Sequence, residues 1–360
     1  MTKAQDYLAQ TEAPVLDKII RLANTDNTFV GVAGFPFSAT AIIARPILAA
    51  AHIPIISPSA SSTALTNQPY FFRVIPSDAG QGKDAAQFAS QTLNARRVAV
   101  FSDGANSYSK SLADSFTSSF TALGTGTDHT VIPESFHLSN ADSLDAPLNN
   151  MLSQNPGVDM IFLAGYADDL DNMKPKLKES APSLPIMGGD AFYEFGGYST
   201  GDYSNFYFTA FTYPDIWRVL CLNNTNCSSP APTATDATQY SQIFDPKGIH
   251  RSEYGYDRPG PHVWQSYDAT SALLQAVESV QASGQSLTLD IVANALSNVS
   301  FQGTTGEISF NGSDPVNKTV VMLCIDSHYH TQLIGTYGQF APGAKNLVLG
   351  IGTIRYQRCA

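Results

Sequence analysis

The chain has 360 residues, of which 43% are hydrophobic and 14% are charged, a composition that allows a large core and argues against a disordered chain. This length exceeds that of one ordinary hydrophobic core and predicts two domains or lobes. The net charge of −11 disfavours nucleic acid and anionic membranes as partners, but it says little about a small ligand, which meets only a local field.

Short apolar runs alternate with helical patterns along most of the chain. The clearest helical pattern lies at 267–280, where apolar residues recur every three or four positions, and 82–93 and 109–123 are also expected to be helices. Strands are expected at 29–33, 53–57, 98–102, 159–164, 185–188, 206–210 and 319–325. Several of these runs are continuously apolar, as in strands covered on both faces. The alternation predicts an α/β fold with mostly parallel sheets.

Residues 221–262 interrupt this alternation. The segment is rich in Asn, Ser, Thr and Pro, which predicts a long surface loop or insertion. No apolar run reaches the roughly 20 residues of a membrane span. The first fourteen residues lack the apolar stretch of a signal peptide, so we expect any export signal to be missing from this sequence.

Four cysteines are present, and an even number suits two disulfides in an exported protein. Two of them flank a short polar loop, "LNNTN", that a disulfide could close. The alternative is four free thiols in a cytosolic protein. Zinc is disfavoured because no CxxC or HxxxH spacing occurs. The cysteines are Cys221, Cys227, Cys324 and Cys359.

Hydroxyl groups follow the first two predicted strands. Ser38 lies in "GFPFSAT", and Ser59, Ala60 and Ser61 lie in "SPSASST", each near an expected helix start. Ligands of open α/β sheets bind beyond the carboxyl ends of the strands. Backbone N–H groups and hydroxyls at a helix start suit a carboxylate.

Two tyrosines and a carboxylate follow the next three strands: Tyr108 in "DGANSYSKS", Tyr166 in "GYADD" and Asp190 in "GDAFYEF". A carboxylate suits an ammonium group, and aromatic rings cover an aliphatic body or a cation. Together with the hydroxyls they predict a site for a zwitterion, that is, an amino acid. Taken singly, the serines fit ordinary N-caps, Asp190 a turn residue and the tyrosines half-buried packing.

Six segments resemble, in order, the type I periplasmic binding proteins. They are "IPIISPSASSTAL", "YFFRVIPSDAGQGKDAAQF", "RVAVFSDGANSYSKSLADSF", "VDMIFLAGYADDLDNM", "PIMGGDAFY" and "GPHVWQSYDATSALLQAV". The most similar group is the branched-chain amino-acid (leucine, isoleucine and valine) binding proteins of ABC importers, and the match runs from about residue 18 to 340.

The resemblance implies two α/β lobes joined by three crossings, with a ligand in the cleft and a closed form that a membrane permease recognises. It implies a monomer outside the cytoplasm, periplasmic or anchored at the cell surface, without a cofactor or metal. The expected boundaries are 1–79 with 212–303 for the N-terminal lobe, 80–211 with 304–340 for the C-terminal lobe, and 341–360 as an extension.

The resemblance also implies roles for the site residues. Ser38, Ser59 and Ser61 would take the ligand carboxylate, with the backbone rather than the side chain acting at Ser59. Tyr108 and Tyr166 match aromatic positions of the other lobe. Asp190 matches the acidic position that pairs with the ammonium, whereas Asp268 matches a structural Asp near a helix start.

Two departures from the family pattern stand out. Only a short segment stands where a strand and a helix should precede "LDKIIRLANTDNTFVGVAG", so either the chain is truncated or another segment fills that place. The late segment "NLVLGIGTI" is strand-like and extends past the usual end, and we expect it to complete the first lobe's sheet.

Three alternatives remain from the sequence. The pattern G-x-S-x-G at 197–201, followed by histidines at 250, 262, 328 and 330, would fit a hydrolase, but its flanking segments are a poor strand and a poor helix. The same fold also serves ligand-sensing receptors. An importer protein for aromatic acids, amides or short peptides is the third alternative, although Asp190 favours an amino acid.

Overall fold

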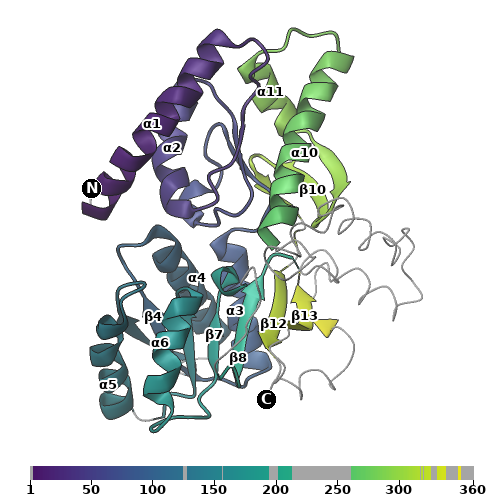
Figure 1. The fold of residues 1–360 in the computed structure, drawn as a ribbon. Helices are drawn as coiled ribbons and strands as arrows, with labels where there is room; N and C mark the ends of the chain where they lie inside the picture. Colours follow the sequence, from purple (N-terminus) through teal and green to yellow (C-terminus); the bar gives the residue numbers. More distant parts are fainter. Residues whose placement is uncertain are drawn as a thin grey trace, which may run out of the picture. The chain divides into compact units, whose positions relative to one another are not determined.

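The contacts of the chain divide it into two compact units (Figure 1). The computed structural model describes residues 3–124, 128–155, 157–193, 202–212, 261–316, 318, 320–325, 331–337 and 348–349. The first unit comprises Met1–Gly80, Gly104–Leu112 and His262–Lys318. The second unit comprises Gln81–Asp103, Ala113–Pro261 and Thr319–Ala360.

The first unit contains a parallel three-stranded sheet. Its strands are β1 (Val32–Ala33), β2 (Ile55–Ser57) and β3 (Phe71–Arg73), in that order. Strands β2 and β3 are buried along their whole length, including their last residues, Ser57 and Arg73. Ser57 lies opposite Arg73 in the register, so these two residues mark the carboxyl edge of the sheet.

The described part of the first unit also contains four helices and a three-stranded antiparallel sheet. Helices α1 and α2 pack against each other, with Ala41, Ala44 and Leu48 of α2 fully buried at helical spacing beside Leu16 of α1. The helices are α1 (Lys3–Thr25), α2 (Ser38–Ala50), α10 (Pro261–Ala282) and α11 (Leu289–Leu296). The antiparallel strands are β9 (Ser300–Gly303), β10 (Gly306–Asn311) and β11 (Asp314–Pro315).

The second unit contains an eight-stranded sheet in the order β14-β13-β12-β8-β7-β6-β4-β5. Strands β8, β7, β6, β4 and β5 run parallel to one another. Strand β12 is antiparallel to β8, β13 is antiparallel to β12, and β14 is antiparallel to β13. The parallel strands are β4 (Arg97–Ser102), β5 (Thr130–Ser135), β6 (Met160–Ala164), β7 (Ile186–Gly188) and β8 (Phe206–Ala210). The antiparallel strands are β12 (Val320–Ile325), β13 (Thr331–Tyr337) and β14 (Val348–Leu349).

Four of the described helices precede or join these parallel strands along the chain, although the first residues of two of them group with the first unit. Gly82 of α3 lies so close to α4 that a Cβ atom there would stand 2.6 Å from the backbone nitrogen of Phe116. The helices are α3 (Asp78–Gln91), α4 (Ser107–Leu123), α5 (Asp145–Gln154) and α6 (Ala167–Leu177). One face of the sheet shares its core with α5 and α6 through residues such as Leu148, Leu163 and Leu170.

The expected fold class is confirmed, and each of the seven expected strands overlaps an observed one. The three expected helices are also present, each two to six residues longer at its start. The segment near residue 348 corrects an expectation, because β14 pairs with β13 of the second unit and not with the first unit's sheet. Strand β13 offers it an open edge, since β12 occupies the other side.

Cys324 lies in β12, is fully buried and is disulfide-bonded, as expected for an exported protein. Several other expectations concern residues outside the described part of the chain. These are Cys221, Cys227, Cys359, the insertion up to residue 260, the pattern at 197–201 and the histidines at 250, 328 and 330.

Candidate functional site

The loop that follows β2 is fixed by its own serine hydroxyls. The Ser57 hydroxyl accepts a hydrogen bond from the Ala60 N–H at 3.0 Å and donates to the Phe35 carbonyl at 2.9 Å. The Ser59 hydroxyl donates to the Pro36 carbonyl, also at 2.9 Å. Both serines therefore tie the loop to the segment that leads into α2.

Arg73 holds the same loop from the neighbouring strand. Its guanidinium is completely buried, and its Nη1 donates to three consecutive carbonyl oxygens, those of Ala60 (3.4 Å), Ser61 (2.9 Å) and Ser62 (3.0 Å). Its Nε donates to the Asp314 carboxylate at 2.5 Å, which compensates the buried positive charge. Arg73 therefore turns three carbonyls of the loop to one side.

The N–H groups of this loop point to the other side, because N–H and C=O are antiparallel in a trans peptide. The Ser62 N–H donates to the Ser38 hydroxyl at 3.1 Å, and the Thr63 N–H donates to the Ser111 hydroxyl at 2.9 Å. N–H groups directed the same way attract anions. These two N–H groups are already satisfied by hydroxyls of the first unit, so they offer a carboxylate a favourable local field and not two free donors.

Ser61 directly precedes Ser62 and Thr63 in the loop. It is completely buried, and its hydroxyl has no hydrogen-bond partner among the described residues. A buried hydroxyl in that state costs free energy unless a ligand or water satisfies it. The expected helix start is wrong in one respect, since only the 3-10 turn η1 (Thr63–Leu65) follows, and the donors belong to the loop itself.

Asp190 lies in the second unit, directly after β7, in the 3-10 turn η3 (Asp190–Phe192). It is 8% exposed, and its Oδ1 accepts a hydrogen bond from Gln81 Nε2 at 2.9 Å. Gly188 makes this turn possible, because a Cβ atom there would stand 2.3 Å from the Phe192 ring. The Gln81 Oε1 atom is buried without a partner among the described residues.

Tyr166 follows β6, the strand next to β7, and is half-buried at the start of α6. Its N–H donates to Oδ2 of Asp169 at 2.9 Å, and the Ser139 N–H donates to Oδ1 at 2.8 Å. Burial raises the pKa of Asp169, although these two hydrogen bonds oppose the shift. The Asp169 carboxylate therefore fixes the backbone that carries Tyr166.

Tyr108 lies in the first turn of α4 and is 7% exposed. The Asn106 carboxamide oxygen caps this helix, accepting from the N–H groups of Tyr108 and Ser109 at 3.0 Å each. Residues 104–112 group with the first unit, where Ser111 contacts Thr63.

The structure brings the predicted residues together in two sets. In the first unit, one loop contains Ser59, Ala60 and Ser61, and the Ser38 hydroxyl accepts a hydrogen bond from it. In the second unit, adjacent strands are followed by Tyr166 and Asp190. Arg73 and Gln81 were missed by sequence reasoning. A signal for Arg73 does exist, because a charged residue inside the apolar run "YFFRV" needs a buried partner.

In the described part of the chain, no His, Cys, Asp and Glu residues are grouped closely enough to hold a metal ion. Among the helices described, none has both the length and the apolar character needed to cross a membrane. Asp268 has the structural role that was expected, because its carboxylate accepts four hydrogen bonds from Thr304 and Thr305 at 2.5–2.9 Å.

Two α/β units with polar loops after their parallel strands define a class of small-molecule binding proteins. Residues 15–323 match the periplasmic binding protein family, and the chain belongs to that family. The protein is therefore a solute-binding protein, from a family of binding proteins rather than enzymes. A comparison with curated proteins finds no match.

Solved structures of similar fold include a leucine-binding protein from Thermotoga maritima, which is 21% identical with a TM-score of 0.69 over 91% of this chain and 85% of that one. A branched-chain amino-acid binding protein from Streptococcus pneumoniae, in complex with isoleucine, is 21% identical with a TM-score of 0.65 over 94% and 84%. A solute-binding protein from Rhodopseudomonas palustris, in complex with 4-hydroxybenzoate, is 15% identical with a TM-score of 0.68 over 90% and 82%. The suspected resemblance is confirmed.

Proposed function

We propose that this protein captures an amino acid, branched-chain or related, outside the cytoplasm and delivers it to the permease of an ABC importer. The observation that carries the proposal is the buried Ser61 hydroxyl in the loop after β2, which has no hydrogen-bond partner among the described residues. This loop would bind the ligand carboxylate. The leucine and isoleucine proteins of similar fold support the ligand class.

Asp190 would bind the α-ammonium group of the same ligand. It is a buried carboxylate whose Oδ1 has a neutral donor, Gln81, as partner. An ammonium group is a stronger partner for a carboxylate than a neutral amide because the hydrogen bond is charge-assisted. Gln81 would then orient the carboxylate toward the ligand.

A ligand panel tests the proposal. We expect thermal unfolding of the protein to shift upward with leucine, isoleucine or valine, because a ligand present at a thousand times its Kd adds about 4 kcal/mol to the free energy of unfolding. The panel would contain the twenty amino acids, benzoate and 4-hydroxybenzoate. The absence of a shift with every amino acid would contradict the proposal.

The substitution Asp190→Asn tests the ammonium contact. We expect it to weaken amino-acid binding by about 2–5 kcal/mol, because the ligand's charge would be buried without a partner. Asp142→Asn is a matched control, since this exposed Asp lies in the same unit, in the turn η2 (Ala141–Leu144). Equal affinities of the two variants would reject the role of Asp190.

An aromatic acid is the second candidate ligand. Three solute-binding proteins of similar fold are described in complex with benzoate, 3,4-dihydroxybenzoic acid and 4-hydroxybenzoate. Such a ligand has the carboxylate but not the ammonium group. A thermal shift with aromatic acids alone, together with unchanged binding to the Asp190→Asn variant, would favour this candidate.

A further inference from the structure

A cavity lies in the first unit, at the opposite edge of its sheet from the loop after β2. It has a volume of about 610 Å³ and is bordered by the segment before β3, by α11 and by the turn between β10 and β11. Tyr70 and His52 precede β3 and β2, so they lie at the amino ends of these parallel strands. The loop with Ser61 follows the carboxyl ends. The two sites are therefore distinct.

Asp290 carries the only formal charge among the described residues that line this cavity. Its Oδ1 accepts hydrogen bonds from the Tyr70 hydroxyl at 2.5 Å and from His52 Nδ1 at 2.8 Å. These bonds, the Tyr70 bond first, lower the pKa of Asp290 and keep the carboxylate ionised. The carboxylate is 55% exposed, so it is fixed in place yet accessible to a ligand.

Ser313 supplies a buried hydroxyl at the cavity. The residue is 8% exposed, and its Oγ atom has no hydrogen-bond partner among the described residues. It follows Gly312, where the backbone has a φ of +69° and a Cβ atom would stand 3.0 Å from Oδ1 of Asn67. Burying a hydroxyl without a hydrogen bond costs free energy, so the Ser313 hydroxyl indicates a partner from outside the described residues.

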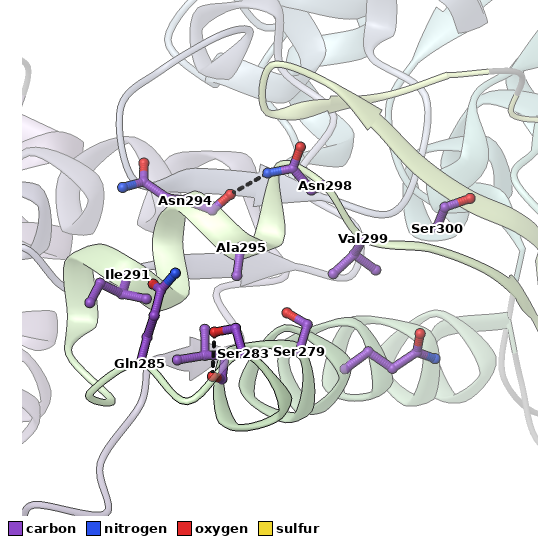
Figure 2. A pocket seen from close by; sticks show the side chains of 11 residues that line it. Ser279, Ser283, Gln285, Ile291, Asn294, Ala295, Asn298, Val299 and Ser300 are labelled. Atoms are coloured by element: carbon purple, nitrogen blue, oxygen red, sulfur yellow. Dashed lines mark hydrogen bonds between the residues drawn. The ribbon is translucent and has the colours of Figure 1, made fainter.

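Asn294 of α11 contributes an amide, which both donates and accepts hydrogen bonds. Asn294 borders both this cavity and the hollow between α10 and α11 drawn in Figure 2, where its side chain points away from α10 while Ala295 and Val299 point toward that helix. The neighbouring hollow between α10 and α11, drawn in Figure 2, is different in kind. Its Ser279 and Ser283 hydroxyls donate to carbonyls of their own helix at 2.8 and 2.7 Å.

We propose that the cavity bordered by Tyr70, Asp290, Asn294 and Ser313 binds a neutral polyhydroxyl ligand of the saccharide class. Neighbouring hydroxyls of a sugar need an acceptor beside groups that donate and accept, which Asp290, Asn294 and Ser313 provide. The half-buried Tyr70 ring presents an aromatic surface to the C–H groups of a sugar ring. No described lining residue is cationic, which disfavours an anion, and Asp290 already has two donors, which weakens its attraction for a cation.

Saturation-transfer NMR on the intact protein tests the proposal with maltose, cellobiose and N-acetylglucosamine as neutral probes. Glucuronate is the anionic probe and glucamine the cationic one. We expect transfer to at least one neutral sugar and at least tenfold weaker binding of glucuronate and glucamine. The absence of transfer to all three neutral sugars at 10 mM, or transfer to glucamine alone, would overturn the proposal.

Variants place the site on the protein. Ser313→Ala and Asn294→Ala should each weaken sugar binding at least fivefold. Asn298→Ala is the matched control, because Asn298 is also an exposed asparagine, lies two residues after α11 and borders the other hollow alone, whereas Asn294 borders both. Equal sugar binding by all three variants would overturn the assignment.

Urea unfolding and leucine binding of the variants distinguish a loss of the sugar site from a loss of folding or of the amino-acid site. Ser313→Ala should unfold at the same or a higher urea concentration than the original protein, since it removes a buried hydroxyl without a described partner. Leucine binding should be unchanged in all three variants, so a failure of this proposal is distinguishable from a failure of the amino-acid site.

Discussion

Ser59 and Ser61 are two residues apart in one loop, yet their hydroxyls are in opposite states. The Ser59 hydroxyl donates to the Pro36 carbonyl, whereas the Ser61 hydroxyl is buried without a partner among the described residues. A structural hydroxyl stabilises the fold, whereas a ligand-binding hydroxyl costs stability until the ligand arrives. The two residues therefore make a matched pair for mutation.

Ser61→Ala should weaken leucine binding by about 1.5–3 kcal/mol, the range for a hydrogen bond to a charged group, and leave the free energy of unfolding equal or higher. Ser59→Ala should do the reverse, lowering the free energy of unfolding by about 1 kcal/mol with little change in affinity. Calorimetric titration and urea unfolding measure the two effects. Full leucine affinity in Ser61→Ala would exclude the hydroxyl from the site.

Asp84 of α3 is a residue whose burial costs stability at neutral pH. Burial raises its pKa to about 7, and Lys83 only partly opposes the shift. Because the native state then holds the proton more tightly than the unfolded state, this group contributes stability below pH 4 that is lost as the pH rises to about 7.

Asp84→Asn should therefore raise the free energy of unfolding by roughly 1–4 kcal/mol at pH 8, since one pKa unit corresponds to 1.36 kcal/mol. The gain should shrink toward pH 4, where the carboxyl group of the original protein is protonated. Urea unfolding of both proteins between pH 4 and pH 8 measures the difference. A gain that does not change with pH would contradict the assigned pKa.

At the scale of elements, β3 controls the site although it contributes no expected ligand contact. Arg73 ends this strand and holds the carbonyls of residues 60–62, so it fixes which way the neighbouring N–H groups point. Arg73→Met should lower the free energy of unfolding by about 3–5 kcal/mol, because Asp314 and three carbonyls lose their partner. It should also weaken leucine binding.

Arg96→Met is the control for this substitution, since Arg96 is an exposed arginine in the second unit that donates to the carbonyls of Ser90 and Ala95. Urea unfolding and amide hydrogen exchange at residues 61–63 measure the effect on the loop. Normal exchange protection and normal affinity in Arg73→Met would contradict the role given to Arg73.

The elements that the sequence predicted well are those with a strong local pattern. Strand β6, "MIFLA", is five apolar residues between Asp159 and Gly165, and such a run predicts a buried strand from the local sequence alone. Strand β3 was not predicted, since its three residues include the charged Arg73. The partner that compensates the charge of Arg73 is Asp314, which lies 241 positions away along the chain.

The candidate site also contains residues that have a local sequence signal and residues that have none. Ser38, Ser61 and Asp190 were predicted because each is a polar residue just after an apolar strand, which is a local signal. Gln81 was not predicted, because its hydrogen bond joins it to a residue 109 positions away. No local pattern distinguishes it from an ordinary glutamine on a helix.

For the molecule as a whole, membership of the periplasmic binding protein family means that function is expressed as ligand affinity. The central claim is that one ligand supplies both a carboxylate and an ammonium group. Each group should then contribute to affinity independently of the aliphatic side chain. This claim can be tested without any mutation, by removing each group from the ligand.

The most direct measurement is calorimetric titration of the protein with leucine, 4-methylpentanoate and 3-methylbutylamine, which share one aliphatic chain. Leucine carries both charged groups, the acid lacks the ammonium and the amine lacks the carboxylate. We predict that leucine binds and that each analogue binds at least about 100-fold more weakly, a loss of about 2.7 kcal/mol. Equal affinity for 4-methylpentanoate and leucine would contradict the ammonium contact and, with it, the amino-acid assignment.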